Sequence, residues 1–294
     1  MKPSLKPPFN PSLKTPKATD AATRPAFPVR LKPGAGVPSA TKLVAGSVST
    51  VRAGGQNGLK QPAPLPSRHV PLPLARAGGV GLDSHAVRAR MVAKLAAQGV
   101  SDAQVLAAMA AVERHRFVDT ALVNQAYEDT SLPIGLGQTI SKPNVVARML
   151  ELLRHGVPGK LGRVLEIGTG CGYQAAVLSH LASEVYSIER LRGLHDKARE
   201  NLRTLRLPNV HLLFGDGMMG YAKGAPYAAI IAAAGGEAIP PAWIEQLAVG
   251  GRLVAPMQTP GGTQALVVVD KTPRGVKQTL LEAVHFVPLK SGTS

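Results

Sequence analysis

The chain has 294 residues, a formal net charge of +16 and a single cysteine. One cysteine cannot form an internal disulfide, which favours a reducing compartment. The longest strongly apolar stretch, residues 227–234, is far too short to span a bilayer, and residues 1–10 lack the apolar segment of a secretory signal. We therefore expect a cytoplasmic protein with no membrane-spanning part.

The positive charge is concentrated in the first 80 residues. This part carries twelve Lys and Arg side chains against one acidic residue, Asp20, and is rich in proline, lysine, serine and glycine. Such a composition buries too little apolar surface to offset the entropy of ordering the chain. We predict a disordered, basic, proline-rich extension over residues 1–81. A nonspecific contact with nucleic acid through counterion release is the less favoured interpretation, because aromatic residues for base stacking are not interleaved with the basic ones.

Residues 82–160 are predicted to form the helical N-terminal part of the ordered domain. Apolar residues at helical spacing follow Ser84, which is placed to cap a first helix. Ser101 and Gln104 have the spacing of a capping box for a second helix. A short basic and aromatic segment follows, in which His115 is expected to be structural rather than catalytic.

Residues 135–143 have the composition of a turn, with two glycines, small hydroxyl residues and a proline. The segment is too short and irregular to predict a helix or strand of its own. Pro143 is placed at the first turn of the next helix, where proline is tolerated. On the residues alone, Ser141 is interpreted as the residue that caps this helix.

A glycine-rich turn organises residues 161–294. The apolar run 164–167 predicts a buried parallel strand, glycines follow at alternate positions, and residues 173–182 predict a helix. Glycine lets the backbone turn sharply and approach a ligand closely, and the helix start offers unpaired N–H groups. This is the first turn of a nucleotide-binding α/β fold. Because Tyr173 replaces the last glycine of G-x-G-x-x-G, a dinucleotide-binding dehydrogenase is not favoured.

Acidic residues follow the next two predicted strands. Residues 184–188 lead to Glu189, 19 positions after Gly170, about where a carboxylate binds a ribose diol in such folds. Residues 210–214 lead to a Gly-Asp-Gly turn that places Asp216 at the same edge of the sheet. The glycine turn and the two carboxylates together predict one ligand crevice.

The remaining residues predict further elements of the same α/β domain. We expect a fourth strand at residues 228–233, a helix at 240–247, and strands at 252–256, 265–270 and 280–287. The sequence leaves open the order in which the last strands lie in the sheet.

Five segments show a closer resemblance to one family within the class I methyltransferases that bind S-adenosylmethionine. They are LPIGLGQTISKP at residues 132–143, VLEIGTGCGYQAAVL at 164–178, GDG at 215–217, EAIP at 237–240 and FVPL at 286–289. Together they resemble the bacterial type of protein-L-isoaspartate O-methyltransferase over residues 87–289. The GQTIS segment is the specific element, because other methyltransferases of the class lack it.

The resemblance implies a Rossmann-like α/β sheet with helices on both faces, an N-terminal helical cap, and S-adenosylmethionine as the cofactor. It implies a monomer that methylates the free α-carboxylate of L-isoaspartyl residues in damaged proteins, after which the ester closes to a succinimide. In the family the serine of GQTIS lies beside the transferred methyl group, so Ser141 is the candidate catalytic residue. The candidate cofactor-binding residues are Glu166, Gly168, Thr169, Gly170, Cys171, Glu189, Asp216 and Gly217. The candidate substrate-binding residues are Ile134, Gln138, Thr139 and Ile140, and no metal site is predicted.

The chemistry agrees with this set of residues. A carboxylate is already ionised at neutral pH, so methyl transfer to it requires no strong base. The enzyme must align the oxygen, methyl group and sulfur and exclude water, and positioning of this kind contributes about 7–11 kcal/mol to lowering a barrier. A serine hydroxyl orients the carboxylate with one hydrogen bond and leaves it nucleophilic, whereas a cationic side chain would over-stabilise the anion.

Several positions depart from the family pattern, including one near Ala232 or Ala233, where relatives usually carry threonine. Ala228 stands where relatives usually carry aspartate, and we expect an effect on stability rather than on chemistry. Cys171 stands where they have serine and is interpreted as a small residue in a tight turn. His285 stands where they often have arginine, which leaves the charge near the site open.

Two other functions remain as alternatives. An RNA methyltransferase is suggested by the basic extension, but residues 232–236 lack the Asn/Asp-Pro-Pro-Tyr segment expected after the fourth strand. A noncatalytic protein-binding module with the same fold is disfavoured by the intact glycines, Glu189, Asp216 and GQTIS.

Overall fold

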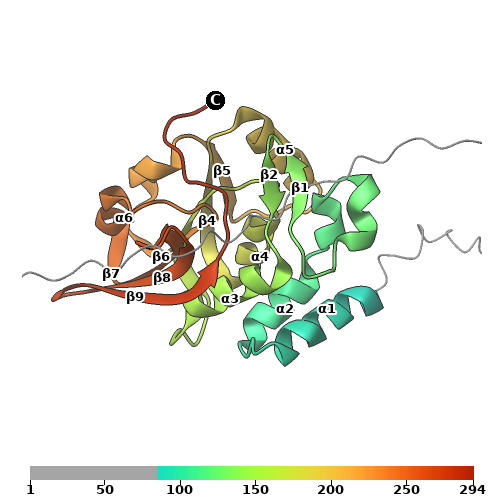
Figure 1. The fold of residues 1–294 in the computed structure, drawn as a ribbon, viewed down its shortest axis with the longest axis horizontal. Coiled ribbons are helices and arrows are strands. Elements are labelled where there is room, and N and C mark those ends of the chain that lie inside the picture. Colours follow the sequence, from blue (N-terminus) through green and yellow to red (C-terminus); the bar gives the residue numbers. More distant parts are fainter. Residues whose placement is uncertain (1–84) are drawn as a thin grey trace, which may run out of the picture. The chain divides into compact units, whose positions relative to one another are not determined.

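The computed structural model describes residues 85–294, so the predicted extension over residues 1–81 lies outside the described residues. The described part is built around a seven-stranded sheet in the order β5-β4-β3-β6-β7-β8-β9 (Figure 1). Strands β3 to β7 are parallel, and β8 and β9 run antiparallel at one end. The strands are β3 (Leu161–Ile167), β4 (Ala182–Glu189), β5 (Val210–Phe214), β6 (Tyr227–Ala232), β7 (Leu247–Gln258), β8 (Gln264–Thr272) and β9 (Gly275–Val284).

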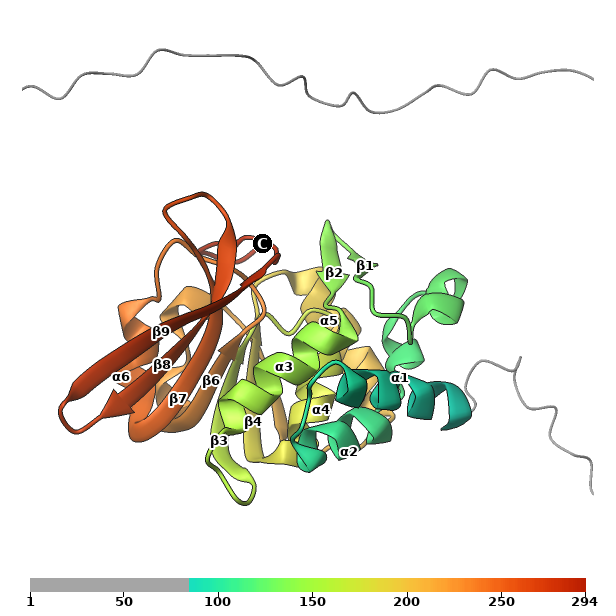
Figure 2. The same ribbon diagram turned by 60° about the horizontal axis from the view of Figure 1, so that its bottom comes forward.

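Helices cover both faces of this sheet, as predicted. Alternate side chains of a strand point to opposite faces, and β3 accordingly sends Val164 into one apolar core and Leu165 into another. The first core packs against α4 through Val177, and the second packs against α6 through Trp243. The helices that flank the sheet are α3 (Pro143–Arg154), α4 (Tyr173–Leu181), α5 (Arg192–Arg203) and α6 (Pro241–Gln246) (Figure 2).

The N-terminal helical cap consists of α1 (His85–Ala97) and α2 (Ala103–Ala111). The residue that caps α2 is Asp102, whose carboxylate accepts hydrogen bonds from the backbone N–H of Gln104 and Val105 at 2.8 and 3.2 Å. Ser101 instead donates through its N–H and its hydroxyl to Glu151 of α3, at 2.6 and 2.9 Å. The predicted capping box at Ser101 is therefore wrong, because a carboxylate far along the chain binds this serine.

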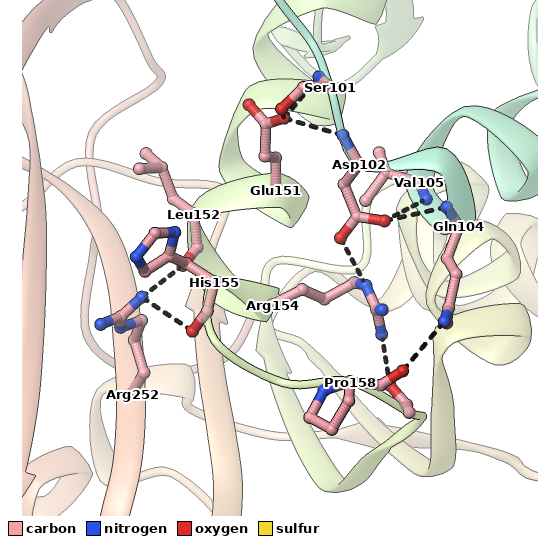
Figure 3. A network of polar contacts seen from close by, with 11 residues as sticks. Ser101, Asp102, Gln104, Val105, Glu151, Leu152, Arg154, His155, Pro158 and Arg252 are labelled. Carbon is pink, nitrogen blue, oxygen red and sulfur yellow. Dashed lines mark hydrogen bonds and ion pairs between the residues drawn. The ribbon is translucent and has the colours of Figure 1, made fainter.

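The same contacts fasten the cap to the sheet (Figure 3). The second carboxylate oxygen of Asp102 accepts from Arg154 Nε at 2.9 Å, and Arg154, which is 2% exposed, also donates to the carbonyl of Gly159 at 2.8 Å. Arg252 of β7 donates to the carbonyls of Leu152 and His155 at 3.1 and 3.3 Å. The contacts from the cap and the contacts from β7 both reach the C-terminal half of α3 or the residue after it. They therefore fix the helix that follows the GQTIS segment.

Residues 132–140 form an antiparallel hairpin of β1 (Leu132–Gly135) and β2 (Gln138–Ile140). The prediction that residues 135–143 contain no element of their own is therefore wrong. The two residues between the strands, Leu136 and Gly137, both have positive φ, at 52° and 70°. Positive φ at both central positions is typical of the tight turns that join paired strands. The hairpin is anchored because Leu132, Ile134 and Ile140 are buried.

The other predicted elements are present, but several bounds differ: the strand predicted at residues 252–256 spans 247–258 in β7, and the one predicted at 280–287 spans 275–284 in β9. Helix α5 has no counterpart among them, since its apolar residues are few and lie among many charges. The helix expected at residues 240–247 ends at Gln246, and Leu247 already begins β7. The short helices are η1 (Arg114–Phe117), η2 (Thr120–Gln125), η3 (Gly217–Met219) and η4 (Ala222–Gly224). No helix within residues 85–294 is long and apolar enough to cross a membrane.

Candidate active site

A cavity of about 490 Å³ opens at the carboxyl edge of the parallel strands. Segments that are distant in the sequence line it. They are the hairpin with the GQTIS segment, the glycine turn, the end of β4 with the residues after it, the residues that follow β5 and β6, and the residues that follow β9. Most of the predicted site residues lie on its wall, namely Ile134, Gln138, Thr139, Ile140, Ser141, Gly168, Thr169, Gly170, Cys171, Glu189 and Gly217. Glu166 and Asp216 do not.

The glycine turn has the backbone conformation that makes glycine necessary. Gly168, Gly170 and Gly172 all have positive φ, at 90°, 57° and 90°. A Cβ atom on Gly170 would lie 3.2 Å from Ile134 Cδ1, and one on Gly172 would lie 3.0 Å from Leu202 Cδ1. The turn is thus packed between the hairpin and α5, and its alternate glycines allow this close packing because they have no side chain.

Glu189 links the glycine turn to the start of α5. One carboxylate oxygen accepts from the N–H of Gly170 and the other from the N–H of Leu191, both at 2.9 Å. The residue is 5% exposed, yet it lines the cavity. Each carboxylate oxygen can accept more than one hydrogen bond, so Glu189 is held in place and still has acceptor capacity toward a ligand.

Glu166 lies beneath the glycine turn instead of in the cavity. It is completely buried, and its carboxyl is hydrogen-bonded to the hydroxyl of Ser187, which in turn lies 2.6 Å from the hydroxyl of Thr169. Burial raises the pKa of Glu166 to about 8, against hydrogen bonds that lower it. The carboxyl is therefore largely protonated at neutral pH, and Thr169 connects it to the cavity wall.

Asp216 also turns away from the main cavity. Its carboxylate accepts from the N–H of Met218 at 2.9 Å and of Gly292 at 2.7 Å. The next residue, Gly217, does line the cavity and accepts through its carbonyl from Trp243 Nε1 at 2.8 Å. A Cβ atom on Gly217 would lie 2.6 Å from Ile167 Cγ2, so only glycine fits at this position.

The residues Leu289–Ser294, here called the closing segment, run across the end of the site. Besides the bond from Gly292 to Asp216, the carbonyl of Gly292 accepts from Arg190 Nε at 2.9 Å. Ser294 pairs with the backbone of Arg190 and Arg192, at 2.9 and 2.8 Å. Since Arg190 directly follows Glu189, the closing segment fixes the backbone next to the proposed ribose-binding carboxylate.

Ser141 lies where the main cavity meets a second hollow of about 340 Å³. The N-cap of α3 is Lys142, and the N–H of Asn144 donates to the Asp129 carboxylate at 2.9 Å. The interpretation of Ser141 as the helix cap is therefore wrong, because the helix begins one residue later and the carboxylate of Asp129 takes a first-turn N–H. The second hollow is also lined by Lys142 and His285, both of which are exposed.

Arg114 is a residue of the site that sequence reasoning missed. It is completely buried, and its guanidinium donates to the carbonyls of Ser141 and Ala126, both at 2.8 Å. The guanidinium also lies over the ring of Tyr173, 4.8 Å from its centroid. The carbonyl partners lie 12 and 27 positions away in the sequence, so no local pattern distinguishes Arg114 from an exposed arginine.

Cys171, Ala228 and His285, which depart from the family pattern, have different surroundings. Cys171 is buried, and burial raises the pKa of its thiol to about 11, which agrees with a small packing residue. Ala228 lies near the start of β6, and its Cβ would lie 3.1 Å from a Cβ on Gly162, far from the carboxyl edge. His285 lines the second hollow together with Ser141.

Comparison with known proteins places this geometry in context. The family model described as protein-L-isoaspartate(D-aspartate) O-methyltransferase matches residues 86–294. A protein-L-isoaspartate O-methyltransferase of Methylibium petroleiphilum is 66% identical over 218 residues, which cover 73% of this chain and 81% of the relative. One of Leptothrix cholodnii is 62% identical over 238 residues, which cover 80% and 84%.

Solved structures agree with this match. A structure named protein-L-isoaspartate O-methyltransferase has a TM-score of 0.63 at 28% identity, and the match covers 69% of this chain and 66% of that one. A Plasmodium falciparum structure, described as such an enzyme in complex with S-adenosyl-L-homocysteine, has a TM-score of 0.61 at 24% identity and shares the fold over 69% of this chain and 98% of its own.

Proposed function

The chain belongs to the protein-L-isoaspartate(D-aspartate) O-methyltransferase family, and we propose which residues of its cavity bind the cofactor and which bind the acceptor. It transfers the methyl group of S-adenosylmethionine to the free α-carboxylate of L-isoaspartyl residues in damaged proteins, which initiates repair through a succinimide. In our proposal the glycine turn and Glu189 hold the cofactor, and Ser141 orients the acceptor carboxylate.

One observation carries this proposal: a single cavity is lined both by the glycine turn and by the GQTIS segment. Its volume of about 490 Å³ lies within the usual range for small-molecule sites. Glu189 supports a ribose diol as its partner, because both its oxygens are fixed by backbone N–H groups and have acceptor capacity left. The residues present therefore fit the cofactor.

The cofactor supplies an electrophilic methyl group on a sulfonium, and the protein supplies position. The acceptor is an anion at neutral pH, so the site needs no group to remove a proton from it. Ser141 lies at the junction of the two hollows, where an acceptor in the second hollow would reach the first. One hydroxyl donor at that junction is sufficient to orient a carboxylate.

Arg114 is a positioning residue in this proposal. Its side chain donates to the carbonyl of Ser141 from the buried side, so the backbone of this serine, which lines both hollows, stays fixed. The interaction over Tyr173 ties the same arginine to the first residue of α4. The GQTIS segment and the glycine turn are thereby braced by one side chain.

We further propose that residues 82–294 are the methyltransferase domain, with residues 82–160 as its helical part and 161–294 as its cofactor-binding core. The family match over residues 86–294 supports this boundary. We propose a cytoplasmic monomer that acts on isoaspartyl proteins and peptides. Contact between the basic residues 1–81 and nucleic acid is not part of the proposed function.

The test is methylation of paired peptides that differ only in Asp against isoAsp, with labelled S-adenosylmethionine. We expect label in the isoaspartyl peptide alone, as a base-labile ester. Gly170→Val should abolish labelling and cofactor binding, because φ is 57° and the new side chain would meet Ile134. Gly262→Val is the matched control, since Gly262 also has a positive φ, of 76°, but nothing within 4 Å. Equal labelling of both peptides, or labelling of RNA only, would contradict the proposal.

A further inference from the structure

The second hollow has a lysine on its wall and no acidic side chain to balance it. Lys142 and His285 line the hollow together with Ser141, and both are exposed. The other described residues of the wall are apolar or carry a hydroxyl, and none of them is an aspartate or a glutamate. The proposed function uses only Ser141 of this wall, so Lys142 has no role in it.

Acidic side chains on the neighbouring elements have other partners. Glu282 of β9 is paired with Arg148, with 2.9 Å between Oε1 and Nε. The carboxylate of Asp129 accepts from the N–H of Asn144 at 2.9 Å. Among residues 85–294, no carboxylate forms an ion pair with Lys142. A lysine ammonium carries three N–H donors, and those of Lys142 are therefore available to a substrate.

The position of Lys142 separates its charge from the reacting carboxylate. It directly follows Ser141, so the two Cα atoms are about 3.8 Å apart. Ser141 is half-buried at the junction of the two hollows, whereas Lys142 is exposed. An exposed lysine lays its aliphatic stem along the protein and keeps its ammonium in water. The charge therefore lies at the mouth of the hollow, where it meets the substrate outside the isoaspartyl residue and does not over-stabilise the acceptor anion.

The stretch of substrate that Lys142 can reach is short. Successive residues of an extended peptide lie about 3.3–3.6 Å apart, and the lysine stem has four carbons. A side chain immediately before or after the isoaspartyl residue is thus within reach, whereas one five residues away lies about 17 Å off. The carboxylate of an adjacent glutamate or aspartate is the group that complements the ammonium.

We propose that Lys142 is a specificity-determining residue, which selects isoaspartyl segments that carry a glutamate or aspartate next to the isoaspartyl residue. The inference rests on the proposed function, because it needs the acceptor to occupy the second hollow. The ammonium donates to the flanking carboxylate, while Ser141 orients the carboxylate that is methylated. Ion pairs in contact with water are weak, so the selection is a preference in KM and not an absolute requirement.

The experiment measures methyl transfer by the full chain to end-capped isoaspartyl peptides at an ionic strength of about 0.1 M, where charges more than about 10 Å apart are largely screened. Glutamate stands immediately before, immediately after, or five residues from the isoaspartyl residue, and each peptide has a glutamine counterpart. We expect an adjacent glutamate to lower KM about two- to fivefold relative to glutamine, with little change in kcat. The distant pair should show no difference. At 1 M salt, where the screening length is about 3 Å, the preference should disappear.

Three variants assign the preference to the charge of Lys142. Lys142→Gln should give equal KM values for the adjacent glutamate and glutamine peptides, whereas Lys142→Arg keeps the charge and should retain the preference. Lys94→Gln is the matched control, because it removes the same charge from an exposed residue of α1 that lines neither hollow. It should retain the preference as well. Thermal melting identifies variants that have lost the fold.

The outcomes separate this inference from the proposed function. Equal KM values in every pair for the wild type would overturn the inference and leave the proposed function intact. The same holds for a folded Lys142→Gln that keeps the preference or slows the glutamate and glutamine peptides by the same factor. A wild type that methylates none of the isoaspartyl peptides would instead refute the proposed function itself.

Discussion

Ser141 is fixed through its backbone, whereas its hydroxyl is the group assigned to the reaction. Arg114 binds the Ser141 carbonyl at 2.8 Å, and Pro143 begins the helix two residues later. The backbone of a reacting residue must be held closely, since a displacement of about 1 Å can lower a rate about 100-fold. The buried Arg114 therefore fixes the backbone of Ser141, and the hydroxyl has only to orient the acceptor carboxylate.

The first prediction tests whether the Ser141 hydroxyl orients the acceptor. Ser141→Ala should lower turnover on an isoaspartyl peptide by about 10- to 100-fold, because the acceptor loses the donor that orients it. Cofactor affinity and melting temperature should hardly change, since the hydroxyl caps no helix. Ser141→Thr keeps a hydroxyl and should retain more activity than the alanine variant. Full turnover in Ser141→Ala would remove the serine from the mechanism.

The sequence predicts residue types at the site better than side-chain directions. The glycines at 168 and 170 and the carboxylate of Glu189 lie on the cavity wall, because strand ends and turn chemistry are local properties of the chain. Glu166 and Asp216 are at the predicted edge of the sheet, but the side chain of the first points under the turn and that of the second toward Gly292. These directions depend on partners that are distant in the sequence.

At the scale of elements, the hairpin and the closing segment decide how the cavity is enclosed. The hairpin escaped prediction because its strands are short and β1 contains a proline and a glycine, so its stability comes from the burial of Leu132, Ile134 and Ile140. The closing segment has no regular structure at all and is held by backbone contacts to Arg190 and Arg192 and by the Asp216 carboxylate. Neither kind of contact leaves a periodic pattern in the sequence.

The closing segment yields the next prediction. A chain that stops after Leu289 loses the bonds of Gly292 and Ser294 to Asp216, Arg190 and Arg192. Net contributions of about 0.5–1.5 kcal/mol per hydrogen bond suggest that affinity for S-adenosylhomocysteine falls by about tenfold, chiefly through faster dissociation. Stopped-flow release of the ligand measures this directly.

Ser291→Ala is the control for the shortened chain. It removes an exposed side chain of the closing segment that does not line the cavity and preserves the backbone contacts, so release should match the wild type. Equal release rates in the shortened and the complete chain would mean that the closing segment does not retain the cofactor.

At the scale of the whole molecule, the sequence predicts the architecture because the pattern of an apolar strand followed by a turn occurs several times along the chain. The parallel strands β3, β5 and β6 contain short apolar runs that are followed by turns, and the strand predicted at residues 210–214 has those same bounds in β5. The order of β7, β8 and β9 could not be predicted, because register and neighbour choice depend on pairing between strands. The ion pair between Asp102 and Arg154 could not be predicted either, because its partners lie 52 positions apart in the sequence.

Two buried or half-buried carboxyls give the folded state opposite responses to pH. Burial acts to raise the pKa of Glu151, but hydrogen bonds from Ser101, Asp102 and Arg148 lower it below its ordinary value. Its stabilising contribution is present above the unfolded-state pKa near 4.5 and is lost as the pH falls through the lower folded-state value. Glu166 has a raised pKa of about 8, so its contribution is complete below pH 4.5 and is lost as the pH rises toward 8.

The last prediction therefore concerns the free energy of unfolding between pH 5 and 8, measured by urea denaturation. Over this window the folded state binds more protons at Glu166 than the unfolded state, so the wild type should lose stability with rising pH, by at most about 1.4 kcal/mol per pH unit from this group. Glu166→Gln cannot ionise and should lose less. The difference between the variant and the wild type should thus shift steadily in favour of the variant toward pH 8. Glu151→Gln is the control, because above about pH 6 Glu151 is ionised in both states, so that its variant should there differ from the wild type by a constant amount. A difference for Glu166→Gln that does not change with pH would show that the Glu166 carboxyl is ionised in the folded protein throughout, and that Ser187 and Thr169 surround an anion.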